Sequence, residues 1–162
     1  MHVRPARMED AEAIRSIYNH EVTTSTATFD LTPRSLDDQR RWLAARSGAH
    51  AALVASDAGG RVVGFGSLSP YRDRPAYRTT VEDSVYVDPG RRRGGVGRSL
   101  LGELVRVATG HGFHTVIARI VGGHEASIAL HRSLGFAVVG TEREVGRKFG
   151  RWLDVVVMQR ML

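Results

Sequence analysis

The sequence predicts one α/β (α+β) domain over residues 1–162, with about seven strands and about four helices. A chain of this length can bury one core but is short for two ordinary domains. Apolar residues follow helical and strand periods in turn, and no linker, repeat or low-complexity stretch separates them. The chain has no cysteine, which excludes a disulfide framework, a thiolate metal site and a cysteine nucleophile.

The first third of the chain predicts one strand and two helices. A short strand contains Val3, and a helix follows with Asp10 as its N-cap. Polar residues 23–26 then form a loop that ends at Phe29. Ser35 opens a capping box with Asp38 in place of the usual Glu, which predicts a second helix. The apolar faces of the two helices carry Ala11, Ile14, Ile17, Tyr18 and Val22, and Leu36, Trp42 and Leu43.

Three strands come next in the chain. Residues 51–55 and 61–68 flank an Asp-Ala-Gly-Gly turn at 57–60, a pattern typical of a β-hairpin. Residues 70–76 form a loop that contains arginine and proline, and residues 79–87 form the third strand.

The rest of the chain predicts two more helices and three more strands. Apolar residues at helical spacing indicate a helix over 96–107, and a strand over 115–121 follows it. A helix over 125–134 ends at Gly135, which occupies the C′ position. Two strands, around 137–145 and 152–161, complete the order.

The segment Ser84–Gly97 carries the strongest functional pattern. A β-type run leads through a turn into arginines and glycines, just before the predicted helix. Glycines allow close backbone approach and a helix N-terminus leaves amides unpaired, so this loop suits an anion such as a pyrophosphate. The glycine spacing fits neither a Walker loop nor a dinucleotide fingerprint. An arginine-rich surface turn is the alternative.

The residues Arg92-Arg93-Gly94-Gly95-Val96-Gly97 match the pattern Gln/Arg-x-x-Gly-x-Gly/Ala. This pattern resembles the coenzyme A pyrophosphate loop of the GNAT N-acetyltransferases, and the predicted order of elements is similar to theirs. The resemblance implies a mixed central sheet that splays near this loop. Stretches at 17–20, 24–26 with Phe29, 80–87, 127–136 and 145–154 resemble more narrowly the phosphinothricin and methionine sulfoximine acetyltransferases. The resemblance also implies acetyl-CoA as cosubstrate and a homodimer. The C-terminal hairpin, with Lys148 and Trp152, would help to build the dimer and the site; a plain strand pair with a turn at Gly150 is the alternative.

Acetyl transfer to an amine needs a base, because an α-amine is protonated at neutral pH. Glu82 is the candidate, since strand alternation places it on the face opposite Val81 and Asp83. The resemblance implies the same role for Glu82 and a proton-transfer role for His131. A solvated glutamate paired with an arginine and a packed core histidine are the alternatives.

The expected cofactor residues lie on the strand, the loop and the last two helices. The backbone at Val85–Val87 would pair with the pantetheine arm, and a free amide there would polarise the thioester. The resemblance implies contacts from Ser133 and, where the family usually has Asn, from His124. Together the expected cofactor residues are Val85, Tyr86, Val87, Arg92, Arg93, Gly94, Gly95, Val96, Gly97, Arg98, His124 and Ser133.

Substrate recognition is expected in the loop at 71–77. Arg72 and Arg74 suit a carboxylate and a second anionic or strongly polar oxygen group, and Asp73 and Tyr77 lie beside them. Phe29 is expected to wall the pocket, with simple packing as the alternative. An exposed basic loop is the alternative for the arginines.

The sequence thus predicts a cytoplasmic enzyme that acetylates the α-amine of a small amino-acid analogue with acetyl-CoA. No metal motif and no membrane-length apolar run are found. The net charge of +6 permits nucleic-acid binding, but the arginines are scattered and lack interleaved aromatics. A GNAT that acts on another amine, such as a protein N-terminus, and a non-catalytic coenzyme A-binding module are the other possibilities.

Overall fold

Seven strands form one mixed sheet in the order β1-β2-β3-β4-β5-β7-β6 in the computed structural model, which describes residues 1–162. Every neighbouring pair is antiparallel except β4 and β5, which run parallel. The strands are β1 (His2–Pro5), β2 (Ala52–Ser56), β3 (Val62–Pro70), β4 (Thr80–Val87), β5 (Thr115–Val121), β6 (Ala137–Lys148) and β7 (Arg151–Met161). This order confirms the predicted seven-stranded mixed sheet.

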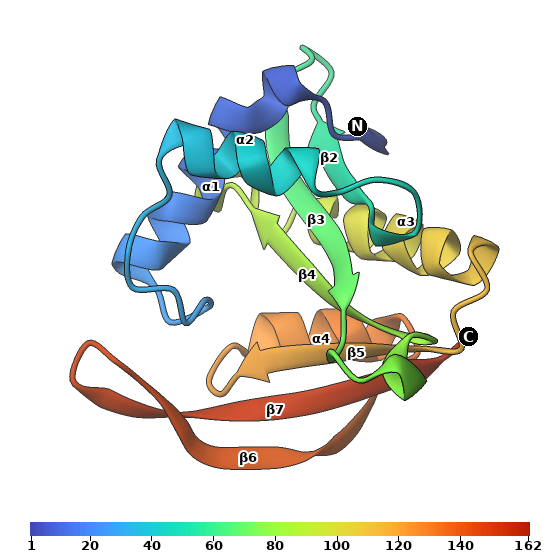
Figure 1. The fold of residues 1–162 in the computed structure, drawn as a ribbon. Coiled ribbons are helices and arrows are strands. Elements are labelled where there is room, and N and C mark those ends of the chain that lie inside the picture. The colour runs from blue at the N-terminus through green and yellow to red at the C-terminus, as the bar shows by residue number, and fades with distance from the viewer.

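Four helices cover the two faces of the sheet (Figure 1). They are α1 (Ala11–Thr24), α2 (Leu36–Ala44), α3 (Val96–Gly110) and α4 (Glu125–Ser133). Helices α1 and α2 pack with β2 and β3 in one apolar cluster, which includes Phe65. Helices α3 and α4 pack with β3, β4, β5 and β7 in a larger cluster, which includes Leu100 and Met158. Each helix therefore buries its apolar stripe against the sheet.

The predicted helix boundaries agree with the structure to within one residue except at two C-terminal ends, because α1 runs on to Thr24 and α3 to Gly110. Ser35 accepts a hydrogen bond from the Asp38 amide at 3.1 Å, which confirms the capping box of α2. Gly135 follows α4 with a φ of 85°, a conformation that glycine adopts without strain. Asp10 precedes α1 but does not cap it. Its carboxylate instead accepts the Arg7 amide at 2.7 Å and pairs with Arg4 at 2.8 Å.

The C-terminal hairpin is longer than predicted. Strands β6 and β7 stay paired from Ala137 to Lys148, beyond the predicted end at residue 145. The pairing register shifts between Glu142 and Gly146, where Glu144 has a φ of 52°. Such a bulge bends a strand and interrupts the alternation of its side chains, so the sequence pattern does not show that the strand continues beyond it. The tip of the hairpin thereby reaches the loop that follows α1.

Strands β4 and β5 pair over only three residues each, Thr80–Glu82 with Thr115–Ile117. Beyond Glu82 the two strands diverge, as Figure 1 shows. Residues 83–87 of β4 remain paired with β3 alone. The edge of β4 that faces β5 is therefore without a ladder partner, and α3 and α4 begin on either side of this opening.

Candidate active site

Glu82 lies at the last residue pair before β4 and β5 separate. It pairs with Ser69 on β3 and with Ile117 on β5. Its neighbours Val81 and Val85 pack into the α3 cluster, whereas Tyr86 packs against the α1 cluster. Strand alternation therefore directs Glu82 to the same face of the sheet as α1 and α2.

The Glu82 carboxyl is half-buried and stands among several charges. Burial raises its pKa above the ordinary glutamate value, while the positive charges of Arg119 and Arg72 oppose this increase. A carboxylate with a raised pKa is a better proton acceptor than an ordinary surface glutamate. The geometry thus gives Glu82 the setting of a general base.

The predicted pyrophosphate loop has the conformation of an anion-binding nest. Arg93 and Gly95 have φ values of 66° and 80°, both in the left-handed region. The first backbone hydrogen bond of α3 runs from the Ser99 amide to the Gly95 carbonyl at 3.0 Å, so the amides of residues 96–98 have no acceptor within the helix. Alternating left-handed residues and free amides of this kind suit phosphate oxygens.

The close packing of this loop depends on its glycines. A Cβ at Gly97 would lie 3.1 Å from the Leu130 side chain of α4, and one at Gly94 would lie 3.3 Å from the Arg91 carbonyl. Gly97 therefore lets α3 and α4 approach each other beside the opening between the strands. The residues present fit a coenzyme A pyrophosphate.

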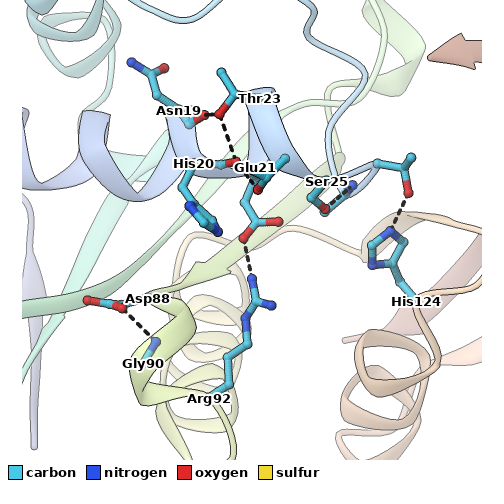
Figure 2. A network of polar contacts seen from close by, with 12 residues as sticks. Asn19, His20, Glu21, Thr23, Ser25, Asp88, Gly90, Arg92 and His124 are labelled. Carbon is cyan, nitrogen blue, oxygen red and sulfur yellow. Dashed lines mark hydrogen bonds and ion pairs between the residues drawn. The ribbon is translucent and has the colours of Figure 1, made fainter. Parts of the chain in front are cut away.

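Acidic side chains hold two of the loop arginines. Figure 2 shows Arg92 paired with Glu21, an α1 carboxylate that is only 3% exposed. Arg91 pairs with Asp57 of the β2–β3 turn at 3.1 Å.

Arg98 donates to Ser133 at 2.9 Å, which joins two predicted cofactor residues. Arg93 has no such partner, so it is the guanidinium of this loop that is free for a phosphate.

The loop after α1 reaches across to the start of α4. A hydrogen bond of 2.8 Å joins Thr26 Oγ1 to His124 Nε2, and Figure 2 shows the His124 ring meeting this loop. His124 was predicted to contact the cofactor, and here it bridges two elements at the mouth of the opening. Its contact with coenzyme A stays a prediction.

His131 lies on the face of β4 opposite Glu82. The residue is 3% exposed, and Nε2 is 3.0 Å from the Asp83 carboxylate while Nδ1 is 2.8 Å from the Ser127 carbonyl. Burial lowers the pKa of His131, but the hydrogen bond and charge of Asp83 outweigh this and raise it overall. Both nitrogens are thus engaged in joining α4 to β4. A proton-transfer role for His131 stays a prediction.

The predicted substrate loop follows β3. The Arg72 guanidinium lies 5.0 Å from the Tyr71 ring centre and 5.8 Å from that of Tyr77. Asp73 and Arg74 are exposed, and with Arg72 and Tyr77 they line a hollow of about 310 Å³. Arg72 also lies close enough to Glu82 to affect its charge. The aromatic contacts restrain Arg72 more than Arg74.

Phe29 packs against the C-terminal hairpin. Its ring lies on Gly146, where a methyl group would overlap the ring carbons. Beside it, the Lys148 ammonium donates to the Thr28 carbonyl at 2.9 Å. The loop that contains Phe29 is thereby held between α1 and the hairpin.

Three charged residues near this site were not predicted. Arg119 and Glu142 form an ion pair of 2.6 Å across the C-terminal half of the sheet, and Glu21 anchors Arg92. Arg119 is a single charge within an otherwise apolar strand, which is a detectable signal. Nothing in the local sequence marks Glu21 or Glu142.

The described side chains include no cluster of three or more histidine and carboxylate groups that could hold a metal ion. No helix has the length and apolar character needed to cross a membrane.

Residues 3–157 match the family model of the acetyltransferase (GNAT) domain. The chain belongs to the GNAT acetyltransferase family. It is 43% identical to an L-methionine sulfoximine/L-methionine sulfone acetyltransferase of Pseudomonas paraeruginosa, over 97% of this chain and 92% of that protein. The predicted family and branch resemblance is confirmed.

Two solved structures of the family superpose closely on this fold. A phosphinothricin acetyltransferase from Sinorhizobium meliloti, solved in complex with acetyl-CoA, has a TM-score of 0.96 and 42% identity, covering 99% of this chain and 88% of that one. A ribosomal-protein-alanine N-acetyltransferase from Brucella melitensis has a TM-score of 0.97 and 42% identity, covering all of both chains. The GNAT fold and an acetyl-CoA-dependent chemistry are thus shared.

The loop geometry predicts the effect of a substitution at Gly95. Gly95→Val should weaken acetyl-CoA binding at least tenfold, because a β-branched residue at a φ of 80° distorts the nest. Gly102→Val is the matched control, since Gly102 lies within α3 in open space with ordinary helical φ. Isothermal calorimetry measures both affinities. Wild-type affinity in a folded Gly95→Val protein would contradict the assignment of the loop.

Proposed function

We propose that this protein transfers the acetyl group of acetyl-CoA to the α-amine of a small amino-acid analogue of the phosphinothricin, methionine sulfoximine or methionine sulfone type. The observation that carries the proposal is the position of Glu82 at the point where β4 and β5 separate, within reach of the positive charges of Arg119 and Arg72. The named activity of the Pseudomonas relative supports the substrate class.

In this reaction the protein forms no covalent bond with the acetyl group. Glu82 accepts a proton from the substrate ammonium, directly or through water, and the neutral amine attacks the thioester carbonyl carbon. The new C–N bond forms as the C–S bond breaks, and the coenzyme A thiolate leaves and takes up a proton. With no cysteine in the chain, direct transfer from acetyl-CoA to the amine is the simplest route.

The free edge of β4 can serve the cosubstrate. Residues 83–87 lack a ladder partner on the side that faces β5. Extended backbone of this kind satisfies its hydrogen bonds with water or with an amide-containing ligand such as the pantetheine arm. The nest at the start of α3 would hold the pyrophosphate, with Arg93 as its free guanidinium.

Replacing the base tests the chemistry directly. Glu82→Gln should lower turnover by about 10²- to 10⁴-fold, the usual contribution of a general base, and leave acetyl-CoA affinity unchanged. Because the base must be deprotonated, wild-type kcat/KM should fall as pH is lowered through the raised pKa of Glu82. Steady-state kinetics across pH measure both effects. The same acid limb in Glu82→Gln would transfer the role to another group.

The substrate class is tested by a panel of amines assayed for thiol release from acetyl-CoA. We expect Arg72→Ala and Arg74→Ala each to lower kcat/KM for methionine sulfoximine by roughly 10- to 150-fold, the loss of a charge-assisted hydrogen bond. An alanyl peptide has no carboxylate beside its amine, so it should lose far less. Acetyl-CoA affinity should stay constant in both variants.

The same panel decides the second candidate, acetylation of a protein N-terminus. The name of the Brucella relative, a ribosomal-protein-alanine N-acetyltransferase, favours this alternative. Equal losses on the amino-acid analogue and on the peptide, or activity on the peptide alone, would support it over the amino-acid analogue.

We also propose that the protein is a homodimer that uses the β6–β7 hairpin. This hairpin exposes several apolar side chains, among them Val145, Phe149 and Trp152, which is 60% exposed. Clusters of exposed aromatic and aliphatic groups often mark protein interfaces. A cytoplasmic location stays the sequence-based prediction.

A charge on the hairpin should separate the subunits. Trp152→Lys should shift the molecular mass from dimer to monomer in analytical ultracentrifugation at micromolar concentration, because burying an unpaired ammonium opposes association. Met8→Lys places the same charge at an exposed apolar residue outside the hairpin and is the control. A wild-type monomer, or an unchanged dimer in Trp152→Lys, would contradict the proposed interface.

A further inference from the structure

An ion pair stands on the sheet beside the proposed base. Arg119 Nη2 lies 2.6 Å from Glu142 Oε1, and both side chains are partly exposed. Arg119 is two residues beyond Ile117, the partner of Glu82. Ala118 and Ile120 pack into the α3 cluster, so alternation directs Arg119 to the opposite face, which Glu82 shares.

The ion pair spans three strands of the sheet. Arg119 pairs with Val157 on β7, which pairs in turn with Gly140 on β6. Glu142 follows Gly140 by two residues and so lies on the same face as Arg119. The arginine therefore stands between Glu82 on one side and its own counterion on the other.

Charged groups from four elements act on Glu82. Arg119 of β5 and Arg72 of the β3–β4 loop favour its ionised form, while Asp83 of β4 and Glu142 of β6 disfavour it. Burial also disfavours ionisation and is the largest single influence. Among the opposing charges, Arg119 has the greatest effect on the Glu82 pKa.

We propose that Arg119 is a positioning residue that keeps Glu82 ionised, and that Glu142 limits how much of the arginine's charge reaches Glu82. The pair thereby sets the lower limit of the pH range in which the base works. This inference rests on the proposed function for its kinetic consequence, but not for its electrostatic one. Removal of Arg119 should therefore raise the pKa of Glu82, and removal of Glu142 should lower it.

The electrostatic part is tested on the free protein. ¹³C NMR of protein labelled at the glutamate carboxyl carbons, with the Glu82 signal assigned by Glu82→Gln, reports its titration midpoint. Arg119→Gln should raise this midpoint and Glu142→Gln should lower it. Arg119→Lys keeps the charge and should stay near the wild-type value. Arg106→Gln removes an arginine from the exposed Glu103 pair of α3 and should leave it unchanged.

An unchanged midpoint in Arg119→Gln, or shifts of the same sign in Arg119→Gln and Glu142→Gln, would overturn the proposal. If Arg119→Gln fails to fold, the midpoints of Glu142→Gln and Arg119→Lys still test the proposal.

Kinetics separate this role from substrate binding. In Arg119→Gln, kcat/KM should be about 3- to 10-fold lower at pH 6, the size expected of one partly screened charge, and equal to wild type at pH 9. An equal loss at both pH values would instead make Arg119 an anchor for the substrate carboxylate and overturn the proposal. If no amine on the panel is acetylated, the proposed function fails, while the titration still decides the role of Arg119.

Discussion

The rest of the structure depends on the short parallel pairing between β4 and β5. Three residue pairs hold the two halves of the sheet together, and then the strands part. Buried backbone groups without partners are costly, so the free edge beyond Glu82 must be open to water or to a ligand. Because the break follows Glu82 directly, the proposed base and the free edge lie at one place. The helices that begin on either side bring the glycine-rich loop to the same opening.

Electrostatics complement this break in the sheet. The chain carries a net charge of +6, yet Glu21 and Asp57 pair with two arginines of the glycine-rich loop. Glu21 is buried, and such a carboxylate is stable only when it is paired, so it fixes the Arg92 guanidinium against α1. These acids orient the loop and leave Arg93 as its unpaired cation. A buried and a half-buried carboxylate thus fix two of the arginines of this loop.

Local patterns in the sequence predicted the elements and the loop, because capping residues, glycines and apolar periods act within a few residues. They also placed Glu82 on its face of β4, since alternation needs no knowledge of neighbours. The contacts of Arg119 with Glu142 depend on β7 lying between β5 and β6, a strand order that no local pattern contains. The bond between Thr26 and His124 joins residues 98 apart, and the sequence alone does not indicate it.

Strand β4 keeps two acidic neighbours in opposite environments. Glu82 lies on the side proposed for the substrate, where burial disfavours its ionised form and two guanidiniums favour it. Asp83 is buried on the other face and holds His131 of α4 at 3.0 Å. A shift of one residue in the register of β4 would exchange the two faces. Glu82 would then lie against α4, and Asp83, which binds His131, would lie in the opening. The pairing of Glu82 with Ser69 on one side and Ile117 on the other therefore fixes both the chemistry of one face and the attachment of α4 on the other.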